Sequence, residues 1–260
     1  MSSRIHPSAV IDEAAEIGSD VEIGPFVFIG PGVQIGDDSS VGPFTRIEGP
    51  VVIGRQNNIV GQVSIGTQPQ DLKFGGEMTE LRIGDGNTFR EFVTINRGTA
   101  GGGGLTEIGS DNFFMAYSHV AHDCHVGSHT IFANGATLAG HVAVGDHATI
   151  GAFSAVHQFC RVGEHAFIGG FTVATQDVLP YVKTVGNRSA KTYGVNTIGL
   201  QRKSFSEPAV QALQKAYRIL VRSHLKLEEA LTRIEQELGE IREVRYLVEF
   251  VRGSSRGIIR

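Results

Sequence analysis

Residues 5–36 read IHPSAVIDEAAEIGSDVEIGPFVFIGPGVQIG, and every sixth position of this stretch is isoleucine. The same period continues with aliphatic residues to Ile65. After an interruption, aliphatic residues or phenylalanine carry it from Ile83 to Ile168 with a single one-residue shift. A period of six matches neither the alternation of two in a half-buried strand nor the 3.6-residue period of a helix. The stretch therefore indicates a repeat architecture.

A solenoid accounts for a repeat of six residues. Each hexad supplies one short strand whose aliphatic side chain points inward, and a glycine or asparagine permits the corner that follows. Three such sides make a triangular coil of about eighteen residues, and hexapeptide repeats of this kind are typical of parallel β-helices. The sequence thus predicts a mainly β fold, with a parallel β-helix over residues 1–187.

Two segments break the period. Residues 68–82 and 97–106 do not fit the hexads, and the second of them accounts for the one-residue shift. Loops that project from a rigid scaffold often carry binding residues. We expect both segments to be such loops.

Beyond about Pro180 the hexads give way to helical spacing. Ser206 is the expected N-cap of a first helix, because a proline follows in the first turn and apolar residues then recur at helical intervals. The predicted helices cover residues 206–221, 227–238 and 244–251. Residues 188–260 should therefore form a small C-terminal helical domain.

The composition suits a turn-rich β architecture, since 34 of 260 residues are glycine. There is no basic start followed by an apolar run and no uninterrupted apolar stretch long enough for a membrane span, which predicts a cytoplasmic protein. The two cysteines, Cys124 and Cys160, lack the spacing of a metal site and lie two coils apart, beyond disulfide reach. Both should be reduced.

Charge is divided unevenly along the chain. Residues 1–187 hold 9 basic and 19 acidic side chains, whereas residues 188–260 hold 14 and 8. A basic C-terminal part can attract an acidic protein or a phosphorylated ligand, although runs of charge are often only solvated faces.

Histidine is concentrated in one part of the chain, since eight of the ten lie between His119 and His165. Coils of eighteen residues predict that several polar residues share one side of the prism. These are His122, Asp123, His125, His141, His157 and Gln158. Asp123 and His141 are one coil apart, so neighbouring strands should stack them about 4.8 Å apart.

A histidine beside a carboxylate is suited to general-base catalysis, for example on a hydroxyl that attacks a thioester. Asp123 would orient the imidazole and stabilise its protonated form, and the backbone N–H of Gly140 would stabilise a developing oxyanion. The remaining histidines of this region, His129, His147 and His165, are expected to serve only as hydrogen-bonding or solvated groups.

Several strings in this chain resemble those of UDP-N-acetylglucosamine O-acyltransferases, and the similarity covers nearly the whole sequence. They are QDLKF (70–74), TINRGT (94–99), AHDCHVG (121–127), LAGHV (138–142), AVHQFCRVG (155–163), GVN (194–196) and SSRGIIR (254–260). The resemblance implies a left-handed β-helix that forms a homotrimer. It also implies transfer of an (R)-3-hydroxyacyl group from acyl carrier protein to the 3-position of UDP-N-acetylglucosamine, the first step of lipid A biosynthesis, with no metal or other cofactor.

The resemblance further implies a role for individual residues. His122 matches the general base, Asp123 the orienting carboxylate and Gly140 the oxyanion donor. The substrate-binding positions are Asp71, Lys73, His119, His141, His157, Gln158, Asn196 and Arg202. Gly170 matches the position that limits acyl-chain length, and its lack of a side chain predicts a preference for longer chains. The cleft should lie between subunits, and the basic C-terminal part should attract acidic acyl carrier protein.

Some positions depart from the family pattern. Lys203 stands where a second arginine is expected, and lysine lacks the bidentate phosphate contact of arginine. Arg188 stands where histidine is common. Residues 67–69 differ from the forms typical of strict hydroxyl acceptors, so transfer to a 3-amino sugar, giving an amide, remains an alternative.

Two other classes of protein share the fold. One is a zinc carbonic anhydrase, which would use His119, His122 and His125 as ligands shared between subunits. The other is a hexapeptide-repeat protein without catalysis. The zinc alternative does not explain the loop around Lys73 or the basic C-terminal part, and undiminished acyl transfer by His122→Ala would favour the non-catalytic one.

Overall fold

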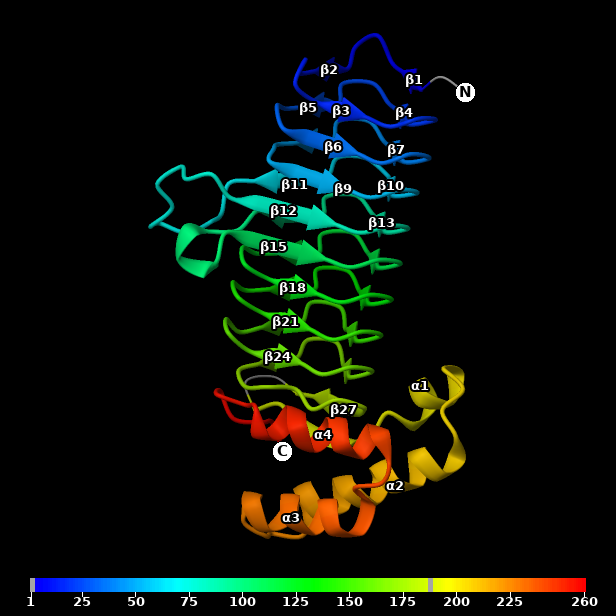
Figure 1. Cartoon of the computed structure of the whole chain (residues 1–260), viewed down its shortest axis with the longest axis vertical. Helices are drawn as coiled ribbons and strands as arrows, with labels where there is room; N and C mark the ends of the chain where they lie inside the picture. Colours follow the sequence, from blue (N-terminus) through cyan, green and yellow to red (C-terminus); the bar gives the residue numbers. More distant parts are fainter. Residues whose placement is uncertain (1–2, 187–188) are drawn as a thin grey trace.

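The hexads form short parallel strands that wind into a triangular prism. The structure, a computed structural model, describes residues 3–186 and 189–260, and each side of the prism is one sheet (Figure 1). Viewed from the N-terminal end, the chain turns anticlockwise as it recedes, so the β-helix is left-handed (Figure 1). The predicted boundary between residues 187 and 188, and with it Arg188, lies outside the described residues.

The strands are listed here by sheet. The first sheet contains β1 (Arg4–Ile5), β4 (Glu22–Ile23), β7 (Ser40–Val41), β10 (Asn58–Ile59), β13 (Thr88–Phe89), β16 (Phe113–Phe114), β19 (Ile131–Phe132), β22 (Thr149–Ile150), β25 (Phe167–Ile168), β27 (Val182–Val185) and β28 (Lys191–Val195). The second contains β2 (Val10–Ile11), β5 (Phe28–Ile29), β8 (Arg46–Ile47), β11 (Ser64–Thr67), β14 (Thr94–Asn96), β17 (His119–Val120), β20 (Thr137–Leu138), β23 (Ala155–Val156) and β26 (Val173–Ala174). The third contains β3 (Glu16–Ile17), β6 (Val33–Ile35), β9 (Val51–Ile53), β12 (Glu80–Ile83), β15 (Leu105–Ile108), β18 (His125–Val126), β21 (Ala143–Val144) and β24 (Arg161–Val162).

The apolar residue that recurs at every sixth position points into the interior of the prism. Ile29, Ile47 and Ile65 pair in register on adjacent coils and are completely buried. Burial of one such side chain contributes roughly 1.5–3 kcal/mol. The six-residue period thus reports the spacing of core side chains, as the sequence predicted.

Three corners join the sheets. Corner 1 lies between the first and second sheets, corner 2 between the second and third, and corner 3 between the third and the first. The residue at the apex of a corner commonly adopts a positive φ, as Asp123 (59°) and His141 (61°) do at corner 2. Aspartate and histidine are enriched among non-glycine residues that accept this left-handed conformation. Polar side chains are therefore presented at the edges of the prism.

The two predicted loops project from corner 2, at the left of Figure 1. Because β12 begins at Glu80, the first loop covers residues 68–79. The second contains a short 3₁₀ helix, η1 (Ala100–Gly102), and ends where β15 begins at Leu105.

The C-terminal part contains elements that helical spacing alone did not predict. β27 continues the first sheet and pairs antiparallel with β28, and the short helix α1 (Thr197–Arg202) follows. The remaining helical elements are α2 (Glu207–Tyr217), η2 (Arg218–Arg222), α3 (Leu227–Leu238) and α4 (Arg242–Arg252). Ser206 caps α2 as expected, accepting a hydrogen bond from the Ala209 N–H.

The helices have an apolar core of their own and are fastened to the last coils. Arg161 pairs with Asp177 at 2.9 Å and donates to the carbonyl of Phe250 in α4 at 2.7 Å. The C-terminal tail returns to the prism, where Asp177 and Ile258 form a parallel bridge. Every helix in the described part of the chain is too short or too polar to cross a membrane.

Candidate active site

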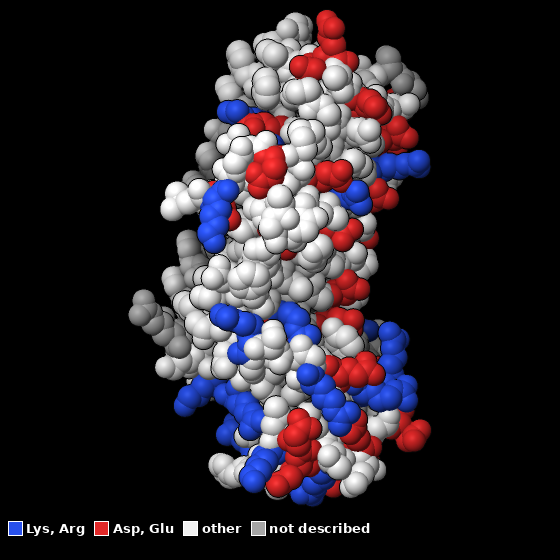
Figure 2. Space-filling model, turned by 60° about the vertical axis from the view of Figure 1, so that its left-hand side comes forward, with Lys and Arg blue, Asp and Glu red and all other residues white. Residues whose placement is uncertain are grey.

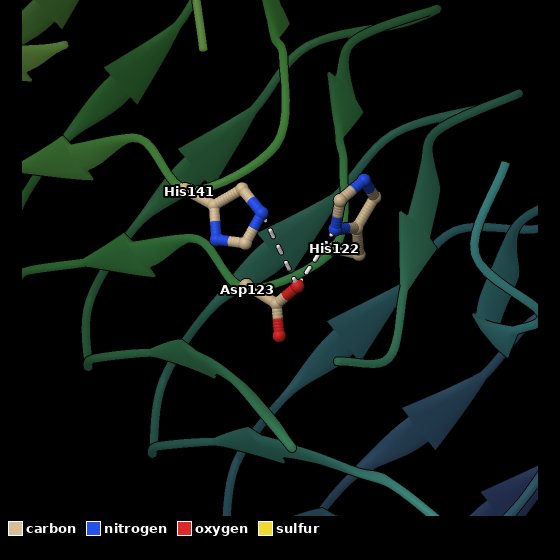
Figure 3. A group of neighbouring side chains, drawn as sticks. All are labelled: His122, Asp123 and His141. Carbon is tan, nitrogen blue, oxygen red and sulfur yellow. Dashed lines mark hydrogen bonds and ion pairs between the residues drawn. The ribbon is translucent and has the colours of Figure 1, made fainter. Parts of the chain in front are cut away.

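His122, Asp123 and His141 meet at corner 2 (Figure 3). Nδ1 of His122 lies 2.7 Å from Oδ2 of Asp123, and Nε2 of His141 lies 3.8 Å from the same oxygen. The two imidazoles are edge-to-face, with ring centroids 5.1 Å apart. The eighteen-residue coil produces this group, because the backbone N–H of His141 bonds to the carbonyl of His122 on the preceding coil.

Asp123 is buried and held from several sides. Its side chain has no exposed surface. Oδ1 accepts a hydrogen bond from the Thr99 N–H at 2.8 Å, and Oδ2 accepts one from the Thr99 hydroxyl at 2.6 Å. Burial by itself raises the pKa of the Asp123 carboxyl, but the bonds from Thr99 and His122 outweigh burial and lower the pKa overall. The carboxylate is therefore ionised at neutral pH.

The bond to Asp123 defines the tautomer of His122. A carboxylate accepts only, so Nδ1 carries the proton and Nε2 is left with a free lone pair. The His122 side chain is 15% exposed, so the ring is not sealed from solvent. This is the arrangement of a general base with an orienting carboxylate.

Gly140 lies directly against the His122 ring. A Cβ atom at this position would come within 2.6 Å of Cε1 and 2.8 Å of Nε2, so only glycine leaves room for the imidazole. None of the hydrogen bonds in the described part of the chain uses the Gly140 N–H. That donor is free beside the proposed base.

The other predicted histidines of this region differ in their surroundings. His141 stacks on Phe159, with ring centroids 4.3 Å apart, and burial lowers its pKa. His119 on β17 accepts or donates a bond with the Thr94 hydroxyl at 2.7 Å, and burial lowers its pKa too. His157 and Gln158 are exposed on the coil that follows His141.

A residue that sequence reasoning missed reaches His157 from the C-terminal tail. The Arg256 guanidinium lies 3.2 Å from Nδ1 of His157. No periodicity relates two residues ninety-nine positions apart, and only the return of the tail to the prism brings them together. Thr99 was missed for a related reason, since it belongs to a loop that breaks the hexads.

His125 does not share the side of His122. It lies on β18 in the third sheet, beyond the corner, where Nδ1 is 3.5 Å from a carboxylate oxygen of Glu107. Grouping His125 with His122 overlooked the turn of the chain at Asp123. The three histidines of the carbonic anhydrase alternative accordingly do not converge in one protomer.

The loop of residues 68–79 carries Asp71 and Lys73. Asp71 accepts a bond from the backbone N–H of Lys73 at 2.9 Å, and its charge raises the pKa of His141 against the larger effect of burial. Glu77 ties this loop to the second one by accepting from the Ala100 N–H. Both loops thus extend corner 2.

Asn196 and Arg202 lie elsewhere, at corner 3. They line a pocket together with Lys203 and the histidines of that corner. The histidines are stacked in a ladder of His129, His147 and His165. Burial, aided by His147 and the charge of Lys203, lowers the pKa of His165 to about 4. Lys183, Arg202 and Lys203 are thus the cations of a pocket whose inner histidine is neutral.

Gly170 lies at corner 1, next to Phe171. A Cβ atom there would be 3.3 Å from the Ala152 carbonyl oxygen, a close but open position. The predicted site residues are therefore distributed over all three corners of one prism.

Among the described residues, the one group of three metal-ligating side chains with ligand atoms within 4.8 Å of one another is His122, Asp123 and His141. Oδ2 of Asp123 already accepts bonds from Thr99 and His122. We therefore assign the group to acid–base chemistry.

Comparison with known proteins identifies the family. The family model described as UDP-N-acetylglucosamine O-acyltransferase, domain 2, matches residues 177–259, and the bacterial transferase hexapeptide model matches residues 105–140. An acyl-[acyl-carrier-protein]–UDP-N-acetylglucosamine O-acyltransferase of Thermodesulfovibrio yellowstonii is 47% identical over 99% of this chain and 100% of its own length. The chain belongs to the UDP-N-acetylglucosamine O-acyltransferase family.

Solved structures agree with this assignment. The Francisella novicida UDP-N-acetylglucosamine acyltransferase is 38% identical, with a TM-score of 0.96 over 98% of this chain and 94% of that one. The enzyme of Bacteroides fragilis is 42% identical, also with a TM-score of 0.96, over 98% and 100% of the two chains. The left-handed β-helix with C-terminal helices is thus the fold of this acyltransferase family.

Proposed function

We propose that this acyltransferase moves an (R)-3-hydroxyacyl group from acyl carrier protein to the 3-hydroxyl of UDP-N-acetylglucosamine, the first step of lipid A biosynthesis. The observation that carries the proposal is His122, whose Nδ1–H is committed to buried Asp123 while Nε2 stays free beside the unpaired N–H of Gly140. The named relatives are O-acyltransferases, which favours the hydroxyl over a 3-amino acceptor.

The reaction follows from these groups. Nε2 of His122 takes the proton of the sugar hydroxyl as its oxygen attacks the thioester carbonyl carbon. Asp123 stabilises the imidazolium that forms, and the Gly140 N–H stabilises the oxyanion of the tetrahedral intermediate. The intermediate collapses, the carbon–sulfur bond breaks, and the imidazolium returns its proton to the departing thiolate. The products are the ester and free carrier protein thiol.

We place the substrate-binding residues on both sides of a cleft between protomers. His119, His141, His157 and Gln158, with Asp71 and Lys73 on the loop, belong to corner 2, whereas Asn196 and Arg202 belong to corner 3. In one protomer these corners are at opposite edges of the third sheet (Figure 1). A neighbouring copy can bring its corner 3 to this corner 2, so we propose a homotrimer whose sites are completed by the partner.

Corner 1 supports the trimer. It carries a ladder of aromatic rings that are between 42% and 71% exposed. They are Phe26, Phe44, Phe92, Tyr117, Phe153 and Phe171. The rings stack as three pairs, Phe26 on Phe44, Phe92 on Tyr117 and Phe153 on Phe171. So many exposed aromatic residues along one edge fit a surface buried between copies of the chain.

The oligomer is tested by light scattering. We expect a mass about three times 27.9 kDa. Phe153→Asp should reduce both the mass and the activity, whereas Val52→Asp, which places the same charge at an exposed apolar position on the third sheet, should not. A monomer that retains full activity contradicts the shared site.

The carrier protein should bind at the C-terminal part. Lys and Arg side chains gather over the helical end of the molecule (Figure 2), in the segment with 14 basic and 8 acidic residues. An interaction of this kind weakens as salt screens it. Affinity for acyl carrier protein that does not change with ionic strength contradicts this assignment. A cytoplasmic location stays a prediction.

The decisive test of the function is the product. Purified protein is offered a panel of 3-hydroxyacyl carrier proteins with both UDP-N-acetylglucosamine and its 3-amino analogue, and the products are analysed by mass spectrometry. We expect an ester on the 3-oxygen, with preference for the longer chains. Gly170→Met should move that preference to shorter chains, and an unchanged preference rejects the role of Gly170. Amide formation alone rejects the proposed acceptor.

A further inference from the structure

Thr99 stands out in the string TINRGT, because no role for it follows from the reaction itself. Its hydroxyl donates to Oδ2 of Asp123 at 2.6 Å, and its backbone N–H donates to Oδ1 at 2.8 Å. Thr99 therefore donates one hydrogen bond to each oxygen of the buried Asp123 carboxylate. Oδ2 is also the oxygen that receives the His122 Nδ1–H.

The rest of the glycine-rich loop helps to hold Thr99 against the Asp123 carboxylate. The Thr99 hydroxyl oxygen accepts the Gly102 N–H at 3.1 Å, which closes the turn η1. Gly102 lies directly against the Asp123 carboxylate, where any side chain would collide with it. On the preceding coil, the Thr106 hydroxyl accepts a hydrogen bond from the Asp123 N–H at 2.8 Å. The loop thus packs over the Asp123 carboxylate and binds both of its oxygens.

Asp123 has two possible imidazole partners. Nδ1 of His122 lies 2.7 Å from Oδ2, and Nε2 of His141 lies 3.8 Å from the same atom. These are the titratable groups that face the carboxylate, and the charge of Asp71 acts on His141. Without the hydrogen bonds from Thr99, a small rotation of the carboxylate would bring Oδ2 closer to His141 and weaken its bond to His122.

We propose that Thr99 is a positioning residue of the reaction, which holds the Asp123 carboxylate in the rotation that serves His122. The inference rests on the proposed function and adds a residue to it. None of the Thr99 hydrogen bonds in the described part of the chain goes to His122 or Gly140. The effect of Thr99 passes through Asp123, so it should alter the chemical step and not the binding of the sugar nucleotide.

The test is a graded series at position 99. Thr99→Ser keeps the hydroxyl, Thr99→Cys keeps a weak donor, and Thr99→Val keeps the shape without a donor. Loss of one hydrogen bond to a charged group predicts a fall in kcat of roughly 10- to 100-fold for Thr99→Val, a smaller fall for Thr99→Cys and near-normal turnover for Thr99→Ser. KM for UDP-N-acetylglucosamine should change by less than about threefold, since no substrate contact is lost.

The pH profile separates positioning from mere structural support. Without the hydroxyl, Oδ2 becomes more basic and stabilises the imidazolium form of the base, so the acidic limb of kcat/KM should move to higher pH in Thr99→Val. Thr130→Val is the matched control. It removes a buried hydroxyl that donates to a side-chain oxygen, Oδ1 of Asn112, at 2.7 Å on the far corner. We expect Thr130→Val to change neither kcat nor the pH of the acidic limb of kcat/KM.

Three outcomes are distinguishable. A Thr99→Val enzyme with wild-type kcat and pH profile overturns the inference, while an inactive His122→Asn enzyme in the same assay keeps the proposed function. An active His122→Asn enzyme overturns the proposed function itself. If Thr99→Val does not fold, equal turnover and equal pH profiles for Thr99→Cys and Thr99→Ser overturn the inference.

Discussion

Corner 2 and corner 3 show how one repeat produces two different histidine arrangements. At corner 3, His129, His147 and His165 recur every eighteen residues, and their rings stack with centroids 4.8 and 4.6 Å apart. At corner 2, the rings of His122 and His141 are perpendicular, with an interplanar angle of 89°. The apex residues of both corners have nearly the same positive φ. His122 is not an apex residue, since it precedes Asp123, and the residue one coil after it is Gly140. The difference therefore arises first from the positions on the coil that carry histidine.

The carboxylate and the loop over it add a second difference. Asp123 occupies an apex of corner 2, is buried, and accepts a hydrogen bond from Nδ1–H of His122. At corner 3 the nearest comparable contact joins His129 to Asp111 at 3.7 Å, and that carboxylate is more than half exposed. The repeat determines where the histidines lie. The inserted loop of residues 97–106 buries the Asp123 carboxylate, and this carboxylate orients His122 as a base.

The strongest way to break this comparison is to remove the proposed base. His122→Asn should lower kcat by roughly 10³-fold or more, because loss of general-base catalysis costs 10²–10⁴-fold. His125→Asn is the matched control, since it changes a nearby exposed histidine on the third sheet. Steady-state acyl transfer by both variants gives the answer, and comparable losses would refute the assignment.

Gly140→Ala tests the fit of the ring. The added methyl would come within 2.6 Å of Cε1 of His122, so the imidazole must move away from the free N–H of Gly140. We expect a loss of roughly 100-fold in kcat with a folded protein, in the range found when an oxyanion donor is lost. A crystal structure of the variant should show the displaced ring, and an undisplaced ring with full activity would reject this account.

Two neighbouring glycines sharpen the role of the loop. Gly102→Ala should push the Asp123 carboxylate aside and reduce kcat roughly tenfold or more, because small misplacements of catalytic groups are costly. Gly101→Ala meets nothing within 4 Å and should behave as the wild type. Equal activities of the two variants, measured side by side, would show that the packing of this loop over Asp123 does not matter.

The smallest expected effect concerns corner 3 and stability. The pKa of His165 is lowered to about 4 from an ordinary value of 6.5, so the unfolded chain binds the proton more tightly. The stabilising contribution is complete above pH 6.5 and is lost as pH falls toward 4. Between pH 7 and 5 the melting temperature should fall by about 2–4 °C less in His165→Phe, which keeps a ring in the stack, than in the wild type. If the melting temperatures of His165→Phe and the wild type change equally with pH, the contribution assigned to His165 is wrong.

Much of the architecture could be predicted from the sequence because the repeat has a physical cause. The recurring isoleucines from Ile23 onward are buried core residues, whereas the first three, at the N-terminal end, are exposed or only partly buried. Coil arithmetic alone brought Asp123 beside His141. The same arithmetic misplaced His125, since it counts residues along a coil but does not show where the chain turns. The strands β27 and β28 and the helix α1 were not predicted, because their pattern is neither hexad nor long helix.

The contacts that complete the site could not be predicted for a different reason. Thr99 reaches Asp123 only because the loop folds over the prism, and Arg256 reaches His157 only because the tail returns to it. Neither contact follows a period. Sequence reasoning therefore found the residues that the coil itself presents and missed those that approach from outside the coil.

A structure with UDP-N-acetylglucosamine bound tests the central claim most directly. The quantity to measure is the distance from the sugar 3-oxygen to Nε2 of His122. The account predicts a hydrogen bond of about 2.6–3.2 Å, with the nucleotide reaching Asn196 and Arg202 of a neighbouring protomer. A 3-oxygen that lies beside the stacked histidines of corner 3, or out of hydrogen-bond reach of His122, would contradict it.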